Sequence, residues 1–172
     1  MFETILLATD GSDNAGRAAA AAGHLAKACD AQLIIVHVAA PYTGLAEITE
    51  SPLGKSLPAD VQRDIDDLLK RMGGWEQTPF AQVPAPESAV RFLSETAIEA
   101  SAEIARENGA TQIEKAVTVG DAPSEILAEA EKRKASLIVM GSRGQSNVKQ
   151  MLICSVSQKV LHLASSPCLL VK

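Results

Sequence analysis

Two short polar loops contain the residues of this chain whose types and spacing could do chemistry. One is Gly141-Ser142-Arg143-Gly144, which follows an apolar run and precedes a helix-like segment opening with the hydroxyls of Ser155 and Ser157. Glycines let a backbone approach a ligand closely, and the N–H groups and dipole at a helix start bind anions such as phosphate. The spacing indicates an anion site. A Gly-x-x-Gly pair is also common in ordinary loops, and Ser155 is equally suited to cap the helix.

The second loop is Thr9-Asp10-Gly11-Ser12, which follows the first apolar run of the chain. The Asp10 carboxylate could accept a hydrogen bond from a ribose hydroxyl or help to hold a metal ion. It could equally be a turn residue or a helix N-cap, as its neighbours Gly11 and Ser12 suggest. Ligands of doubly wound sheets bind beyond the carboxyl ends of the strands, where the strand order reverses. If the first and fourth strands are neighbours, both loops open into one crevice.

The elements that must position these loops are predicted from hydrophobic patterns. Continuous apolar runs are typical of strands that are covered on both faces of a parallel sheet. The runs are Ile5–Ala8, Leu33–Val38, Ala116–Val119, Leu137–Met140 and Cys168–Val171. Apolar residues with helical spacing lie between them, at positions 18–29, 93–104, 121–130 and 156–163. The alternation predicts a single doubly wound α/β domain over residues 1–172, with parallel strands, right-handed crossovers and helices on both faces.

An insert interrupts this alternation at about residues 41–87, between the second strand and the second main helix. It contains six of the eight prolines and the pair Gly73-Gly74, which disfavour regular structure. Val61, Ile65, Leu68 and Met72 predict one short amphipathic helix inside it. A structureless loop of this length is unusual in a compact domain, so we expect part of it to pack on its own subunit or on a partner.

Composition excludes several classes of protein. The net charge of −5 argues against a nucleic-acid surface, and no apolar run approaches the ~20 residues that span a bilayer. The three widely spaced cysteines, Cys29, Cys154 and Cys168, match neither a disulfide framework nor a zinc site. The N-terminus has no basic segment typical of a signal peptide. We therefore expect a cytoplasmic protein that binds neither nucleic acid nor membrane.

Several segments together resemble the universal stress protein family. They are "ILLATDGS", "LIIVHV", "VGDAPSEIL", "LIVMGSRG" and "SVSQKVLHLASSPCLLVK", and they extend over nearly the whole chain. The resemblance implies a five-stranded parallel sheet in the order 3-2-1-4-5. In that order the first and fourth strands are neighbours, as the crevice requires.

The resemblance also implies a site for ATP or AMP, with or without Mg²⁺. Nucleotide-binding members of the family carry G-x2-G-x9-G-[S/T], and Gly141, Gly144 and Ser155 match it. Asp10 matches an acidic residue near the ribose or metal, while Val38 and Met140 match positions lining the adenine pocket. The residues expected to bind nucleotide are Thr9, Asp10, Val38, Met140, Gly141, Arg143, Gly144, Ser155, Val156 and Ser157.

Cys154 departs from that pattern, because it stands where the family has its third glycine. Its side chain would occupy phosphate space if it pointed into the loop, and would leave the backbone N–H groups available if it pointed into the sheet. If Cys154 blocks the site, no nucleotide binds, and the alternative function is a dimeric signalling or interaction module. A thiol at a helix start could also act as a redox sensor, whereas a buried thiol is only a small apolar group.

An enzyme is the third hypothesis considered. The chain has neither the S-G-G-x-D-S loop nor the HIGH-type motif of related folds that activate substrates with ATP. No base and nucleophile lie in neighbouring predicted loops, so we expect no catalytic residues and at most slow ATP hydrolysis.

The last strand predicts a homodimer. In the implied order, Leu169, Leu170 and Val171 lie at the edge of the sheet. A bare apolar edge offers unpaired N–H and C=O groups, which the same strand of a second copy can pair. The alternatives are that the insert covers this edge or that a dimer uses another face.

Overall fold

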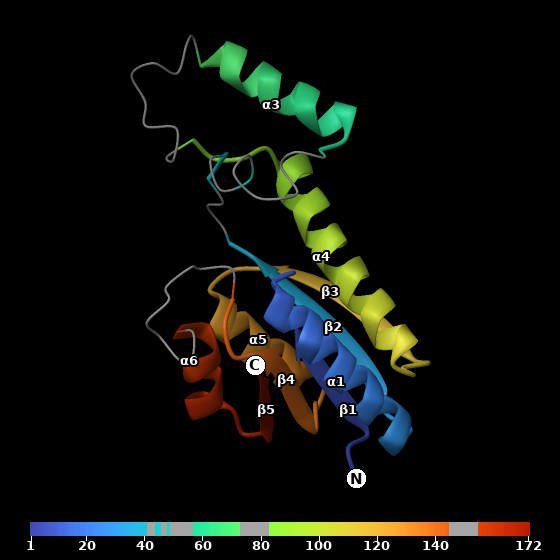
Figure 1. Cartoon of the computed structure of the whole chain (residues 1–172). Helices are drawn as coiled ribbons and strands as arrows, with labels where there is room; N and C mark the ends of the chain where they lie inside the picture. The colour runs from blue at the N-terminus through green and yellow to red at the C-terminus, as the bar shows by residue number, and fades with distance from the viewer. Residues whose placement is uncertain (41–43, 46–47, 49–56, 73–82, 145–154) are drawn as a thin grey trace.

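A single parallel sheet organises the molecule in the computed structural model (Figure 1). The structure describes residues 1–40, 44–45, 48, 57–72, 83–144 and 155–172. The elements are β1 (Thr4–Ala8), α1 (Asp13–Cys29), β2 (Gln32–Ala39), α3 (Ala59–Arg71), α4 (Glu87–Glu107), β3 (Ile113–Val119), α5 (Ala122–Lys132), β4 (Leu137–Gly141), α6 (Ser155–Leu163) and β5 (Cys168–Val171). The strand order is β3-β2-β1-β4-β5, and every pairing is parallel. The predicted fold class and strand order are therefore confirmed.

Helices cover both faces of the sheet. On one face, α1 and α4 pack on alternate residues of the central strands, for example Ile5 and Leu33. On the other face, α5 and α6 pack on the residues in between, such as Leu6 and Ile34. The central strands are thus apolar on both sides, which is why their sequences read as continuous runs.

Small residues bring α1 and α4 close together. The buried side of α1 is made largely of alanines, and Gly23 lies among them. A Cβ atom on Gly23 would lie 2.5 Å from the Ala105 carbonyl oxygen of α4, closer than atoms can approach. This contact between backbones fixes where α4 crosses the sheet.

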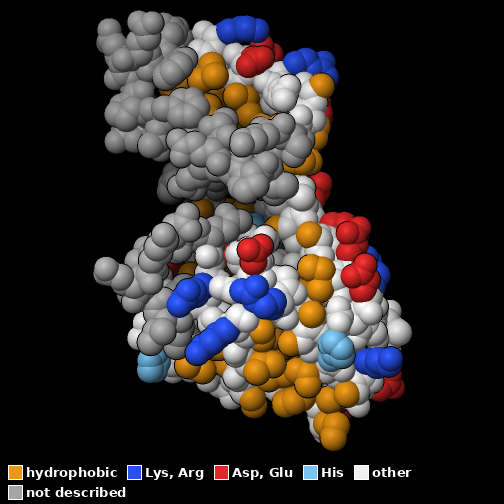
Figure 2. Space-filling model, in the orientation of Figure 1, with side chains coloured by type: hydrophobic (Ala, Val, Ile, Leu, Met, Phe, Trp, Pro, Cys, Tyr) orange, Lys and Arg blue, Asp and Glu red, His pale blue; other side chains and the backbone are white. Residues whose placement is uncertain are grey.

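The insert contributes a second packed unit. The predicted amphipathic helix is present as α3, and its residues Val61 and Ile65 are buried. They join a separate hydrophobic cluster with Leu57, Val83 and Ala89 at the start of α4. Figure 1 shows this unit beyond the end of the sheet, at the opposite end of the molecule from β5. Its outer end carries Lys, Arg, Asp and Glu side chains in Figure 2, as expected for the polar face of an amphipathic helix.

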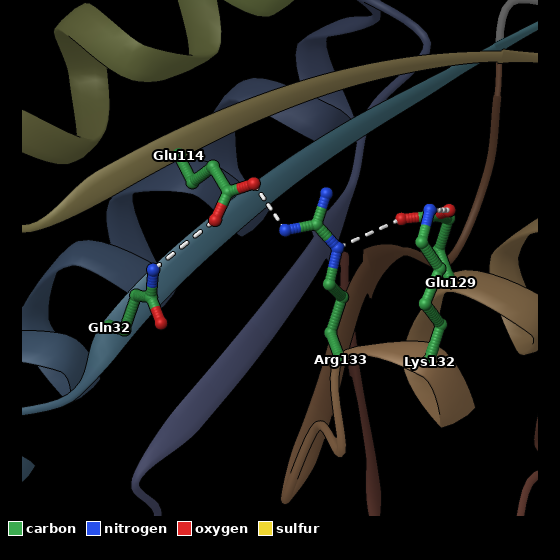
Figure 3. A network of polar contacts seen from close by, with 5 residues as sticks. All are labelled: Gln32, Glu114, Glu129, Lys132 and Arg133. Carbon is green, nitrogen blue, oxygen red and sulfur yellow. Dashed lines mark hydrogen bonds and ion pairs between the residues drawn. The ribbon is translucent and has the colours of Figure 1, made fainter.

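A polar network ties the end of α5 to the neighbouring strands (Figure 3). Glu129 has a side chain only 8% exposed and accepts from Lys132 Nζ at 2.6 Å and from Arg133 Nε at 3.2 Å. Arg133 also pairs with Glu114 of β3, which accepts from Gln32 of β2. The hydrogen bonds from Lys132 and Arg133 hold the pKa of Glu129 below its usual value against the opposing effect of burial. The basic cluster at this helix end therefore has a structural role.

Candidate functional site

The loop after β1 is held by its own side chains. Thr9 is buried, and its hydroxyl lies 2.7 Å from Ser101 Oγ of α4. Asp10 Oδ1 accepts a hydrogen bond from the Ser12 N–H at 3.0 Å, so Asp10 is a turn residue. Ser12 is the N-cap of α1, because its hydroxyl accepts from the Ala15 N–H. The loop is therefore fixed before any ligand arrives.

The loop after β4 meets this first loop at its two glycines. A Cβ atom on Gly144 would lie 2.6 Å from Asp10 Oδ2, so a side chain at this position would force the Asp10 carboxylate to shift. A Cβ atom on Gly141 would lie 3.0 Å from the Cβ of Asn14 in α1. The Asn14 side chain donates to the Arg143 carbonyl at 3.3 Å. The structure thus brings Asp10, Gly141 and Gly144 together, as the crevice argument predicted.

The start of α6 forms a third side of the site, next to the loops after β1 and β4. Ser155 is the first residue of this helix and is exposed, whereas Ser157 is buried. The Ser157 hydroxyl donates to the Gly141 carbonyl oxygen at 2.8 Å, which ties α6 to the end of β4. Ser155 is therefore the better placed of these two hydroxyls to contact a ligand. Cys154 lies outside the described residues, so both hypotheses about the direction of its side chain remain hypotheses.

These elements enclose a cleft of about 230 Å³ at the carboxyl ends of β1, β2 and β4. All ten predicted site residues line it, together with four that the sequence analysis missed: Ala8, Val36, Ala122 and Ile126. Ala122 and Ile126 lie in the first turns of α5, directly after β3. Ligands of doubly wound sheets bind beyond the carboxyl ends of the strands. The same rule applied to the junction between β3 and α5 could have identified Ala122 and Ile126.

The cleft has two chemically different ends. Asp10, Arg143, Gly144 and Ser155 supply polar groups where the loops after β1 and β4 face the start of α6. The residues on β2 and α5 supply apolar surface; they are Val36, Val38, Ala122 and Ile126. A flat apolar group with a polar or anionic tail is complementary to this arrangement.

His37 lies beside the site on the opposite face of β2. Its Nδ1 lies 3.0 Å from the Thr9 carbonyl oxygen. Burial lowers the pKa of His37 below its usual value, although the hydrogen bond to Thr9 and the charge of Asp10 act in the opposite direction. A neutral imidazole that donates from Nδ1 fits this environment.

The described residues contain no group of three or more His, Cys, Asp or Glu side chains that could hold a metal ion. Asp10, the residue predicted to ligate a metal, lines the cleft. A cation bound to its carboxylate would need further oxygen ligands from other groups. No helix in the described part of the chain is long and apolar enough to cross a membrane.

Comparison with known proteins places this arrangement in a family. A model of the universal stress protein family matches residues 1–172. The chain belongs to this family. It is 35% identical over 174 aligned residues to universal stress protein YxiE of Bacillus subtilis, with 100% of both chains covered.

Solved structures of universal stress proteins share the fold. One, a universal stress protein in complex with cAMP, is 27% identical and has a TM-score of 0.62 over 99% of this chain and 97% of that chain. Universal stress protein UspA from Lactobacillus plantarum is 16% identical, with a TM-score of 0.67 over 99% and 97% of the two chains.

Proposed function

We propose that this universal stress protein binds an adenine nucleotide, ATP or AMP, in the cleft between the β1 and β4 loops, and acts in stress response. The observation that carries the proposal is the cleft itself, with an apolar end against β2 and α5 and a polar end at the start of α6. The cAMP complex of a 27% identical universal stress protein supports an adenine nucleotide as the ligand.

The residues of the cleft fit such a ligand by type. The apolar surface around Val38 and Met140 suits a purine base, and Asp10 suits ribose hydroxyls or a Mg²⁺ ion that nucleotide phosphates also ligate. Gly144 keeps the loop free of a side chain beside Asp10. The backbone N–H groups at the start of α6 suit phosphate. We propose no catalytic residue, and expect any ATP hydrolysis to be slow.

Calorimetry on nucleotide-free protein, with ATP and Mg²⁺ and separately with AMP, tests the proposal. Gly144→Ala should weaken binding at least about tenfold, because its Cβ atom would displace the Asp10 carboxylate. The matched control is Gly16→Ala in α1, where a Cβ atom would meet Ile104 at an ordinary 3.4 Å. Equal affinity in both variants would contradict the assigned role of the β4 loop.

The same titrations decide between the two hypotheses about Cys154. If its side chain occupies phosphate space, Cys154→Gly should tighten ATP binding by about 1 kcal/mol or more, because crowding is relieved. Unchanged affinity would mean that the sulfur points elsewhere. Absence of binding to the wild-type protein at millimolar ATP would favour the dimeric interaction module instead.

We also propose a homodimer through β5. This strand pairs on one side with β4, and among the described strands it has no second neighbour. Its residues Cys168, Leu169, Leu170 and Val171 are all half-buried within one chain. An antiparallel copy of β5 would pair the open edge and cover these side chains.

A further inference from the structure

The side chain of Asn14 connects the two loops at the polar end of the cleft. Asn14 is the second residue of α1 and directly follows the β1 loop, in which Ser12 caps the helix. Its Nδ2 donates a hydrogen bond to the Arg143 carbonyl oxygen of the β4 loop at 3.3 Å. The packing there is tight, because a Cβ atom on Gly141 would lie 3.0 Å from Asn14 Cβ and 3.1 Å from the same carbonyl oxygen. Asn14 therefore sets the position of one loop relative to the other.

This hydrogen bond decides which way the peptide between Arg143 and Gly144 faces. The carbonyl oxygen of Arg143 and the N–H of Gly144 belong to the same planar trans peptide and point in opposite directions. With the carbonyl on Asn14, the N–H of Gly144 is directed away from α1. Glycine has no Cβ atom to oppose rotation of this peptide, since it adopts positive and negative φ about equally readily. The Asn14 side chain thus holds an orientation that the loop sequence itself leaves free.

Arg17, about one turn further along α1, fixes the orientation of the Asn14 amide. Its Nη2 donates to Asn14 Oδ1, and its Nε donates at 2.8 Å to the main-chain oxygen of Lys172, directly after β5. A guanidinium has donors only. If the Asn14 amide were turned by about 180°, its NH₂ group would face the guanidinium and its oxygen would face the Arg143 carbonyl, so both hydrogen bonds would be lost. Arg17 therefore selects the one orientation in which Asn14 can donate to the β4 loop.

We propose that Asn14 is a positioning residue for ligand binding and that Arg17 acts through it. By fixing the Arg143–Gly144 peptide, Asn14 keeps the Gly144 N–H turned away from α1 and available as a donor at the polar end of the cleft, which Gly144 lines. Asn14 and Arg17 do not line the cleft themselves, so they act on a ligand only through this loop. The inference rests on the proposed nucleotide function and adds to it a determinant of affinity for the anionic part of the ligand.

A double-mutant cycle measured with two ligands, AMP and adenosine, tests the proposal. The variants are Asn14→Leu, which keeps a similar shape without polar groups, Arg17→Met, which removes the guanidinium, and the double variant. Asn14→Leu should bind AMP about threefold to tenfold more weakly than the wild type, the range for one neutral hydrogen bond. It should bind adenosine, which lacks the phosphate, as tightly as the wild type. Arg17→Met should also weaken AMP binding, and the double variant should bind AMP no more weakly than Asn14→Leu alone.

A matched variant and a ligand-free measurement separate positioning from a general loss of stability. Asn108 Nδ2 also donates to a main-chain carbonyl, that of Ile104 at 2.8 Å, but Asn108 lies at the end of α4 that leads to the amino end of β3. Asn108→Leu should therefore leave the affinity for both ligands unchanged. In ligand-free Asn14→Leu, the NMR order parameter of the Gly144 N–H should fall, or its resonance should broaden through exchange. In Asn108→Leu both should stay at their wild-type values.

Each other outcome overturns a defined statement. If the wild type binds AMP and Asn14→Leu binds it equally tightly, the positioning role is wrong while the proposed function stands. An equal loss of affinity for AMP and adenosine in Asn14→Leu would show a general structural effect and would also overturn that role. Additive losses in the double variant would mean that Arg17 does not act through Asn14. If the wild type binds neither ligand, the proposed function fails, and the NMR comparison alone upholds or overturns the role of Asn14 in holding the loop.

Discussion

At the scale of single residues, the site combines groups that hold its loops with groups left for a ligand. Asp10 illustrates both roles, because Oδ1 closes the turn after β1 while Oδ2 lies against Gly144. Sequence reasoning had offered turn residue and ligand contact as alternatives for Asp10, and the geometry is compatible with both. Ser157 is different: its hydroxyl is used inside the protein, on the Gly141 carbonyl. Sequence spacing could not distinguish it from Ser155, since the distinction depends on how α6 is rotated against β4.

His37 should make the stability of the protein depend on pH. Its pKa is lowered by burial, so the folded state resists a proton that the unfolded chain accepts. Above the ordinary pKa of about 6.5 the imidazole is neutral in both states and contributes no pH dependence. As the pH falls below that value toward the lowered pKa, stability should decrease by up to about 1.4 kcal/mol per pH unit.

His37→Asn tests this expectation, because the amide can still donate to the Thr9 carbonyl but does not titrate. Urea unfolding between pH 7.5 and 5 should show a smaller decrease in the free energy of unfolding for this variant than for the wild type. His24→Asn is the matched substitution at an exposed position on α1 and controls for the general effect of a His→Asn change. Parallel curves for wild type and His37→Asn would contradict the assignment.

At the scale of elements, α4 serves two hydrophobic clusters. Ala89 near its start belongs to the cluster with α3, whereas Ile98, Ala102 and Ala105 pack on α1 and the sheet. The sequence predicted this helix from positions 93–104 only. Hydrophobic periodicity did not reveal the first turns of α4, because the apolar residues there form too short a repeat by themselves. Their packing partners lie in the insert.

The contact between α3 and α4 should contribute measurably to stability. Ile65 is 7% exposed and central to that cluster, so Ile65→Ala should lower the free energy of unfolding by about 2–4 kcal/mol. The control is Asp66→Ala, an exposed neighbour on the same helix, which should change stability by less than about 0.5 kcal/mol. Chemical denaturation followed by circular dichroism measures both. A negligible effect of Ile65→Ala would mean that the insert is only loosely attached in solution.

At the scale of the whole molecule, the parallel sheet followed from the alternation of elements and the strand order from the family resemblance, and both are confirmed. The position of the α3 unit did not follow from either. It depends on packing of Val61 and Ile65 with a residue near the end of the insert, Val83, and with Ala89 at the start of α4. No local periodicity encodes such a contact. In Figure 1 α3 lies far from β5, so this part of the insert does not cover that edge. Other parts of the insert lie outside the described residues, so the alternative that the insert covers the edge stays a hypothesis.

The proposed dimer can be tested through backbone hydrogen bonds alone. The Pro167 carbonyl accepts from the Ile138 N–H of β4, and the Val171 carbonyl accepts from the Ser142 N–H just after β4. The alternation along the strand therefore turns the N–H of Leu170 to the open edge. Leu170→Pro therefore removes a donor of the proposed interface without removing a bond of the sheet, and should yield an ~18 kDa species by light scattering. The control is Leu163→Ser, a change at an exposed residue at the end of α6, and this variant should stay dimeric. A monomeric wild type, or a dimer unaffected by Leu170→Pro, would place any interface elsewhere.

The double membership of α4 has a consequence for how the protein opens. Amide hydrogen exchange reports local unfolding, and a helix frays first where its packing is lost. If the α3 unit detaches, the first turns of α4 lose their cover, but the helix regains a packed partner from Ala97 onward. Fraying from that end should stop before Ser101, whose hydroxyl lies against Thr9 at the site. Slow exchange around Ser101 can therefore coexist with fast exchange near Glu87, and detachment of the α3 unit would leave the shape of the cleft unchanged.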